Sequence, residues 1–165
     1  MPDSKSDLVL DTSVWINLLA TGCWQEITAA LQCACIAPEH VIDEIKRDPA
    51  TGKPYARAGD PLYGKVRIEA LTEAELDHFI ELVSARSGDR LGDGEAASIA
   101  IAASRSHMLV IDERKARRII SERWPTMRLM RSSELLTLPA VTSALGPERA
   151  AECFQRAIQI ARMHV

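Results

Sequence analysis

Leu8-Val9-Leu10-Asp11 and Met108-Leu109-Val110-Ile111-Asp112 are two short apolar runs, and each ends in an aspartate. Each run is rich in branched residues and is followed at once by a segment with helical periodicity, so each is predicted to be a fully buried parallel strand. In open α/β sheets, ligands bind outside the carboxyl ends of the strands, where the strand order reverses. Two carboxylates at two such ends therefore suggest a metal site.

Further short apolar segments, at about 34–37, 66–71 and 127–130, alternate with helical segments. This alternation predicts parallel β–α–β units in an α/β fold, a three-layer α/β/α sandwich with a mainly parallel sheet of four to five strands. Asp11 and Asp112 can meet only if the first and fourth strands are neighbours and the chain reverses between them. The strand order 3-2-1-4-5 satisfies this condition.

The length of 165 residues predicts a single domain with a core large enough to fold alone. We expect a flexible stretch at 1–6 and a helical C-terminal extension at 139–165. The chain has no run of about 18 apolar residues and no signal-peptide pattern at its start, so a cytoplasmic protein without membrane contact is expected. The four cysteines lack metal-site spacing and are expected to be free thiols.

Basic residues gather beside the second strand-end aspartate, although the net charge of −3 argues against non-specific coating of nucleic acid. The basic residues of the stretch 105–131 are Arg105, Arg114, Lys115, Arg117, Arg118, Arg123, Arg128 and Arg131. They form either a solvated helix face or a phosphate-binding patch, and the nearby acidic residues favour the patch. Arg114, Lys115 and Arg117 are the expected substrate-binding members.

The segment from Asp48 to Lys65 is interrupted by several prolines and glycines, so regular structure is not expected there. A loop of this length within a compact domain is either functional or disordered. Its lysine, arginine and tyrosine side chains suit contact with a phosphate backbone, and a mobile connector is the alternative.

Two further carboxylates are predicted to lie at the same edge of the sheet. Glu44 borders the apolar stripe of a helix that follows the second strand, whereas its neighbour Asp43 faces water. Glu95 opens an alanine-rich helix after two glycines that permit close backbone approach. Asp93 lies two residues earlier and could assist as a metal ligand.

Each of these carboxylates also has a purely structural interpretation. Asp11 and Asp112 could be N-caps, Glu95 a first-turn acid favoured by the helix dipole, and Glu44 the partner of a lysine. Four carboxylates at one edge would repel each other unless a cation neutralised them, and Mg²⁺ or Mn²⁺ prefers oxygen ligands. The chemistry that follows is metal-assisted hydrolysis of phosphodiester bonds, with one or two metal ions.

At these residues the sequence resembles PIN-domain nucleases. The similar segments are Leu8-Val9-Leu10-Asp11-Thr12-Ser13, Val41-Ile42-Asp43-Glu44-Ile45, Gly94-Glu95-Ala96 and Ile111-Asp112-Glu113-Arg114. The last two look most like a bacterial and archaeal PIN subfamily of predicted nucleic-acid-binding proteins. The resemblance covers about residues 7–135, and the order and spacing of the segments make it specific.

The resemblance implies a Mg²⁺- or Mn²⁺-dependent endoribonuclease, often the toxin of a toxin–antitoxin pair and commonly a homodimer. It gives the metal-binding and catalytic residues as Asp11, Glu44, Glu95 and Asp112, with Thr12 or Ser13 as a polar, substrate-contacting neighbour. Glu95 stands where many relatives carry aspartate, which changes the reach of the carboxylate. The 48–65 loop and the tail after Pro139 depart from the common pattern and could hold a dimer contact or an antitoxin groove.

Other functions fit less well. A PIN-like module that binds nucleic acid without cleaving it remains open, although all four acidic positions are filled. A phosphotransfer enzyme with Asp11 as nucleophile would want an aspartate at position 13, which is serine. A dinucleotide-binding fold would need a glycine-rich turn after the first strand. The histidines, His164 included, are expected in packing or surface roles away from the acids.

Overall fold

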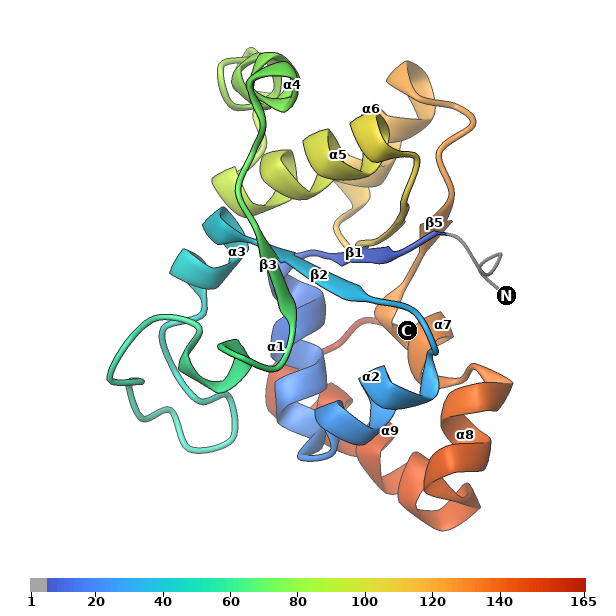
Figure 1. Cartoon of the computed structure of the whole chain (residues 1–165). Helices are drawn as coiled ribbons and strands as arrows, with labels where there is room; N and C mark the ends of the chain where they lie inside the picture. Colours follow the sequence, from blue (N-terminus) through green and yellow to red (C-terminus); the bar gives the residue numbers. More distant parts are fainter. Residues whose placement is uncertain (1–5) are drawn as a thin grey trace.

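The structure is a computed structural model that describes residues 6–165. At its centre lies a five-stranded sheet in which every pairing is parallel and the order is β3-β2-β1-β4-β5 (Figure 1). The strands are β1 (Leu8–Leu10), β2 (Cys35–Pro38), β3 (Arg67–Glu69), β4 (Met108–Val110) and β5 (Leu129–Met130). The predicted strand order is therefore confirmed.

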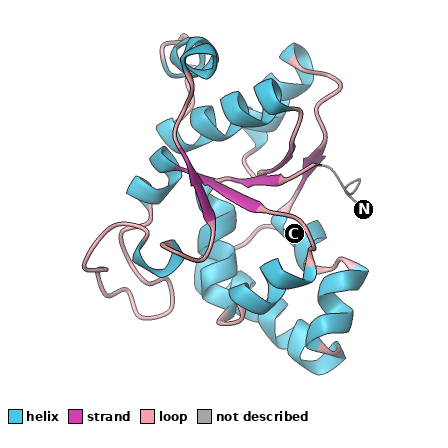
Figure 2. Cartoon of the chain, viewed as in Figure 1, coloured by secondary structure: helices cyan, strands magenta, loops and turns pink. Residues whose placement is uncertain are grey.

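Helices cover both faces of the sheet and complete the predicted three layers (Figure 2). One face carries α1 (Thr12–Thr21), α2 (Trp24–Ala30), α7 (Ser132–Leu136), α8 (Pro139–Leu145) and α9 (Pro147–Ala161). The other carries α4 (Glu73–Val83), α5 (Asp93–Arg105) and α6 (Arg114–Arg123). The short α3 (Glu39–Glu44) follows β2 at the carboxyl end of the sheet.

Two hydrophobic clusters hold these layers together, one on each face of the sheet. Side chains alternate along a strand, so Leu8 and Leu10 enter the cluster with α1 whereas Val9 enters the cluster with α5. Leu10 pairs with Val110, and both are fully buried. This pairing of β1 with β4 brings Asp11 and Asp112 to the same edge of the sheet, as the sequence predicts.

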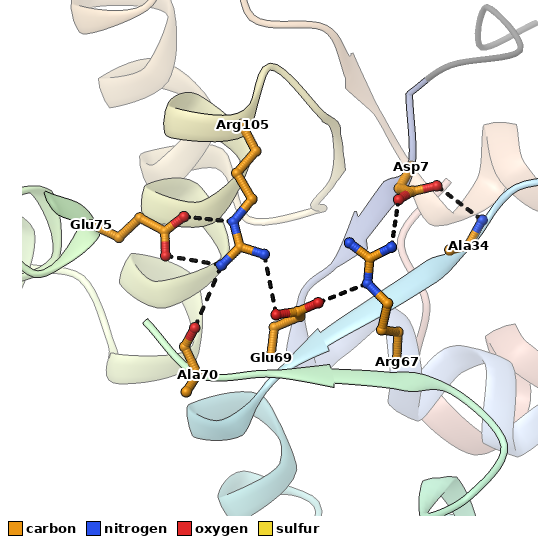
Figure 3. Close-up of polar contacts among 7 residues, drawn as sticks. All are labelled: Asp7, Ala34, Arg67, Glu69, Ala70, Glu75 and Arg105. Carbon is orange, nitrogen blue, oxygen red and sulfur yellow. Dashed lines mark hydrogen bonds and ion pairs between the residues drawn. The ribbon is translucent and has the colours of Figure 1, made fainter. Parts of the chain in front are cut away.

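The edge strand β3 is fixed by a chain of charged side chains (Figure 3). Arg67 contacts Asp7 at 2.8 Å and Glu69 at 2.7 Å, and Glu69 also contacts Arg105 at 3.2 Å. Arg105 then reaches Glu75 at 2.6 Å, whose side chain is almost fully buried. Burial raises the pKa of Glu75, but hydrogen bonds from Arg105 and the Thr72 amide more than offset this and leave it below its usual value.

The segment between α3 and β3 folds back onto α3. The amide of Gly59 donates to the Ile45 carbonyl at 2.7 Å, and Leu62, in a short 3-10 turn (Asp60–Leu62), is fully buried. Gly59 has a φ of +68°, and a β-carbon there would overlap Ile42. This part of the segment is therefore packed against the core.

The C-terminal extension at 139–165 consists of two helices, α8 and α9. α9 packs against α1 and α8 against α2. This packing joins Cys23 and Cys153 in a disulfide across the core, so the expectation of four free thiols is wrong for this pair. Cys33 and Cys35 are free.

Within residues 6–165, no helix has the length and apolar character to span a bilayer.

The expected flexible stretch at 1–6 lies outside the described residues except for Ser6, which is buried.

Candidate active site

A cavity of about 820 Å³ opens at the carboxyl ends of β1 and β4. The four predicted carboxylates all line it. Its lining consists of Asp11, Thr12, Ser13, Ile16, Glu44, Gly92, Glu95, Asp112, Glu113, Arg114, Arg131, His164 and Val165. The cavity therefore lies at the carboxyl edge of the sheet, where the strand order reverses.

Asp11 is the most deeply buried carboxylate of the cavity, with 3% of its surface exposed. Its Oδ2 accepts a hydrogen bond from the Ser13 hydroxyl at 3.1 Å, whereas Oδ1 is buried and has no partner among the described residues. It occupies the N-cap position of α1, but its side chain makes no capping hydrogen bond. Burial, with smaller contributions from the charges of Glu95 and Glu44, raises the pKa of Asp11 to about 7.

Glu44 is held by two groups that come from distant parts of the sequence. The Thr12 hydroxyl donates to Oε2, and the Gly94 amide donates to Oε1 at 3.0 Å. A β-carbon at position 94 would lie 2.5 Å from both Glu44 Oε2 and Thr12 Oγ1. Glycine is therefore required where α5 begins, because the carboxylate occupies the space that a side chain would fill.

Glu95 combines a structural contact with a place in the cavity. Its Oε2 accepts a hydrogen bond from the Gly92 amide at 3.0 Å, which satisfies one free amide at the start of α5. Burial raises its pKa, and the charges of Glu113 and Glu44 add to the effect. Asp93 is exposed and does not belong to the cavity lining, so the structure does not bring it to the other carboxylates.

Asp112 is fixed by residues that the sequence analysis did not identify. Ser132 donates from its amide to Oδ1 at 2.8 Å and from its hydroxyl to Oδ2 at 2.6 Å. Asn17 donates to Oδ2 at 3.1 Å and to the Ser132 hydroxyl at 3.0 Å. The residue that caps α6 is Glu113 rather than Asp112. Asn17 is a polar residue on the buried side of α1, which is the sequence signal that could have identified it.

Only some of the predicted substrate-binding residues line the cavity. Thr12, Ser13 and Arg114 line the cavity. Lys115 lies outside the lining and donates to the Arg90 carbonyl at 2.6 Å. Arg117 also lies outside it and donates to the Ile111 carbonyl at 2.9 Å, at the end of β4.

The remaining basic residues of α6 are paired on its surface. Arg118 contacts Asp89 at 2.6 Å and Glu122 at 3.1 Å, and Arg123 forms an ion pair with Glu81. This part of the basic region therefore behaves as a solvated, salt-bridged face.

Among the lining residues that were not predicted as site residues, two are basic. Arg131, at the start of α7, and His164, in the tail after α9, both line the cavity. The expectation that the histidines stay away from the acids is therefore wrong for His164. The sequence gives no periodic signal for this placement, because it depends on how the tail is directed after the last helix.

The donor set of the cavity fits a hard divalent cation. It offers carboxylate oxygens, hydroxyls and the unpaired, buried Oδ1 of Asp11, which are ligands of the kind that Mg²⁺ and Mn²⁺ prefer. In residues 6–165, no three His, Cys, Asp or Glu side chains are already grouped as a metal-binding cluster. Protein donors satisfy the carboxylates of Glu44 and Asp112, and the charges of Glu95 and Glu44 add to the effect of burial on the pKa of Asp11.

A second cavity, of about 720 Å³, lies at the opposite edge of the sheet, where β2 and β3 begin. Trp24, Cys33, Lys65 and Arg67 are among its lining residues, and the described lining contains no carboxylate. The acidic cavity is therefore the candidate catalytic site.

The fold and the cavity define the class of protein: a parallel α/β protein with four carboxylates at the switch point of its sheet. Residues 7–123, more than two-thirds of the chain, match a family model described as PIN domain. The chain therefore belongs to the PIN-domain family, whose members are generally nucleases. Comparisons with curated proteins and with solved structures each found no match.

Proposed function

We propose that this protein is a metal-dependent endoribonuclease that hydrolyses phosphodiester bonds of RNA in the acidic cavity. The observation that carries the proposal is the carboxylate of Asp11, which is buried beside other acids with one oxygen unpaired. A buried, unpaired carboxylate oxygen is costly unless a ligand satisfies it. Asp11, Glu44, Glu95 and Asp112 are the residues that would hold Mg²⁺ or Mn²⁺.

When bound, such an ion lowers the pKa of a coordinated water and neutralises charge on the scissile phosphate. The chain's own residues position the reactants. Thr12 and Gly94 orient the carboxylate of Glu44, and Ser132 with Asn17 orients that of Asp112. Arg114 places a positive charge at the phosphate. In the reaction, the water oxygen forms a bond to phosphorus, one P–O ester bond breaks, and the leaving oxygen takes a proton.

The test is cleavage of a structured RNA by the purified protein, with Mn²⁺ and with EDTA, beside the Asp11→Asn variant. We expect cleavage by the wild type in Mn²⁺ and its loss in EDTA and in the variant. Cleavage that persists in EDTA or in Asp11→Asn would overturn the proposal.

A non-catalytic, nucleic-acid-binding module is the second candidate, and one observation favours it. Glu44 and Asp112 are bonded to protein donors, and no three potential ligands within residues 6–165 are grouped in advance as a metal cluster. RNA binding without cleavage in any divalent metal would select this alternative. An antitoxin partner, a homodimer and a cytoplasmic location stay predictions from the sequence.

A further inference from the structure

The chain turns sharply after α9, and this turn delivers its last residues to the acidic cavity. Arg162 adopts the left-handed conformation, with a φ of 58°, and the Met163 amide donates to the Ala157 carbonyl at 3.2 Å. The helix thus ends in a left-handed residue, and arginine stands here where glycine is common. The Met163 side chain is buried in the core. The anchor at Met163 fixes the direction of the tail, and His164 and Val165 consequently line the cavity.

Arg131 reaches the same cavity from a second fixed point. Its amide donates to Glu134 at 2.7 Å, and the next residue, Ser132, is buried and bonded to Asp112. Hydrogen bonds therefore fix the backbone at Arg131 and at the residue that follows it. The side chain of Arg131 projects from this fixed point and lines the cavity.

The basic side chains that line the cavity differ from their neighbours in being free. The side chains of Arg114, Arg131 and His164 make no hydrogen bond or ion pair with another residue of 6–165, whereas those of Lys115, Arg117, Arg118 and Arg123 all do. A free guanidinium is a strong donor to phosphate oxygens, and an imidazole supplies at least one further N–H donor. The lining of the cavity therefore combines carboxylates, which suit a cation, with free donors, which suit an anion.

We infer that Arg131 and His164 join Arg114 in a phosphate-binding wall, so that the tail after α9 is part of the substrate site. This inference rests on the proposed function and deepens it. The wall contacts the phosphate backbone of RNA, whose oxygens accept hydrogen bonds from guanidinium and imidazole N–H groups. Phosphate contacts carry no sequence information directly, so loss of these donors should weaken binding about equally across RNA sequences.

The inference is tested by the binding of fluorescein-labelled, single-stranded RNA in EDTA, measured by fluorescence anisotropy. We expect Arg131→Ala and His164→Ala each to weaken binding by about fivefold, and Arg131→Ala to reduce the slope of log K against log salt by about one. Arg86→Ala is the matched control, because Arg86 is an exposed arginine outside the cavity lining. His164→Gln keeps an N–H donor and should retain more affinity than His164→Ala.

The same variants separate this inference from the proposed function. Affinities of Arg131→Ala and His164→Ala equal to that of Arg86→Ala would overturn the inference, even if the wild type cleaves RNA in Mn²⁺. Loss of RNA affinity in both variants would support it, even if no cleavage occurs in any metal. Asp11→Asn, which removes a negative charge near the wall, should bind RNA at least as tightly as the wild type. Weaker binding by Asp11→Asn would contradict the placement of the phosphate on this wall.

Discussion

The amide of Gly94 lies directly against the carboxylate of Glu44, at 3.0 Å from its Oε1. Fifty residues separate the two in the sequence, and the contact joins α3 to the first turn of α5. The glycine is needed for its missing side chain rather than for an unusual backbone conformation, because a β-carbon would stand 2.5 Å from Glu44 Oε2 and Thr12 Oγ1.

Gly94→Ala is therefore expected to displace Glu44 from the cavity. Displacement of a catalytic group by about 1 Å can cost on the order of 100-fold in rate, so we expect a loss of that size in Mn²⁺-dependent cleavage. Gly92→Ala is the matched control, because a β-carbon there would meet only Glu95 Oε2, at an ordinary 3.7 Å. Equal activity of the two variants would contradict the role of this contact.

Asp11→Asn is expected to stabilise the metal-free protein. Burial raises the pKa of Asp11 from 3.8 to about 7, so the folded state binds more protons than the unfolded state between these values. Stability of the wild type should therefore fall as the pH rises through this window, and by roughly 4 kcal/mol at most. Urea unfolding in EDTA should show Asp11→Asn to be the more stable protein near pH 8, with the difference shrinking toward pH 4. A constant difference across this range would contradict the shifted pKa.

Ser132→Ala tests whether the orientation of Asp112 matters. The variant removes the hydroxyl that donates to Asp112 at 2.6 Å and accepts from Asn17 at 3.0 Å. Loss of a hydrogen bond that orients a metal ligand typically costs about 10- to 100-fold in metal affinity or activity, which calorimetric titration with Mn²⁺ can measure. Ser133→Ala, at the neighbouring position outside the cavity lining, should change the affinity little. Equal affinities would show that Asp112 does not need this support.

Arg105→Ala is expected to destabilise the fold at the edge of the sheet. It leaves the carboxylate of Glu75, which is 2% exposed, without its charged partner. Breaking a buried ion pair by removal of one partner costs about 3 kcal/mol or more, and chemical denaturation should show a loss of that order. Arg118→Ala removes an arginine whose two ion pairs are exposed, so it should cost under about 1 kcal/mol. A loss in Arg105→Ala as small as in Arg118→Ala would show that the chain in Figure 3 contributes little.

Much of the architecture could be predicted because its signals are local or topological. Apolar runs located β1 and β4, and the strand order followed from the condition that Asp11 and Asp112 meet. Within the expected helical extension, Pro139 stands at the first position of α8, where proline commonly begins a helix.

The parts of the site that could not be predicted from the sequence depend on tertiary contacts. Ser132 lies 20 residues from Asp112 and Asn17 lies 95 residues from it, so no local spacing indicates that they meet. His164 reaches the cavity only because Met163 is buried and the preceding helix ends in a left-handed turn. By contrast, the acids could be placed because strand ends and helix starts share one edge of a parallel sheet.

The central claim is that the unpaired Oδ1 of Asp11 binds a divalent cation. Crystals soaked in Mn²⁺ and measured at the manganese absorption edge test it directly, because the anomalous signal locates the metal. The account predicts an anomalous peak within coordination distance of Asp11 Oδ1, and no peak at that position in Asp11→Asn. No peak in the acidic cavity of the wild type, under conditions in which the protein cleaves RNA, would contradict it.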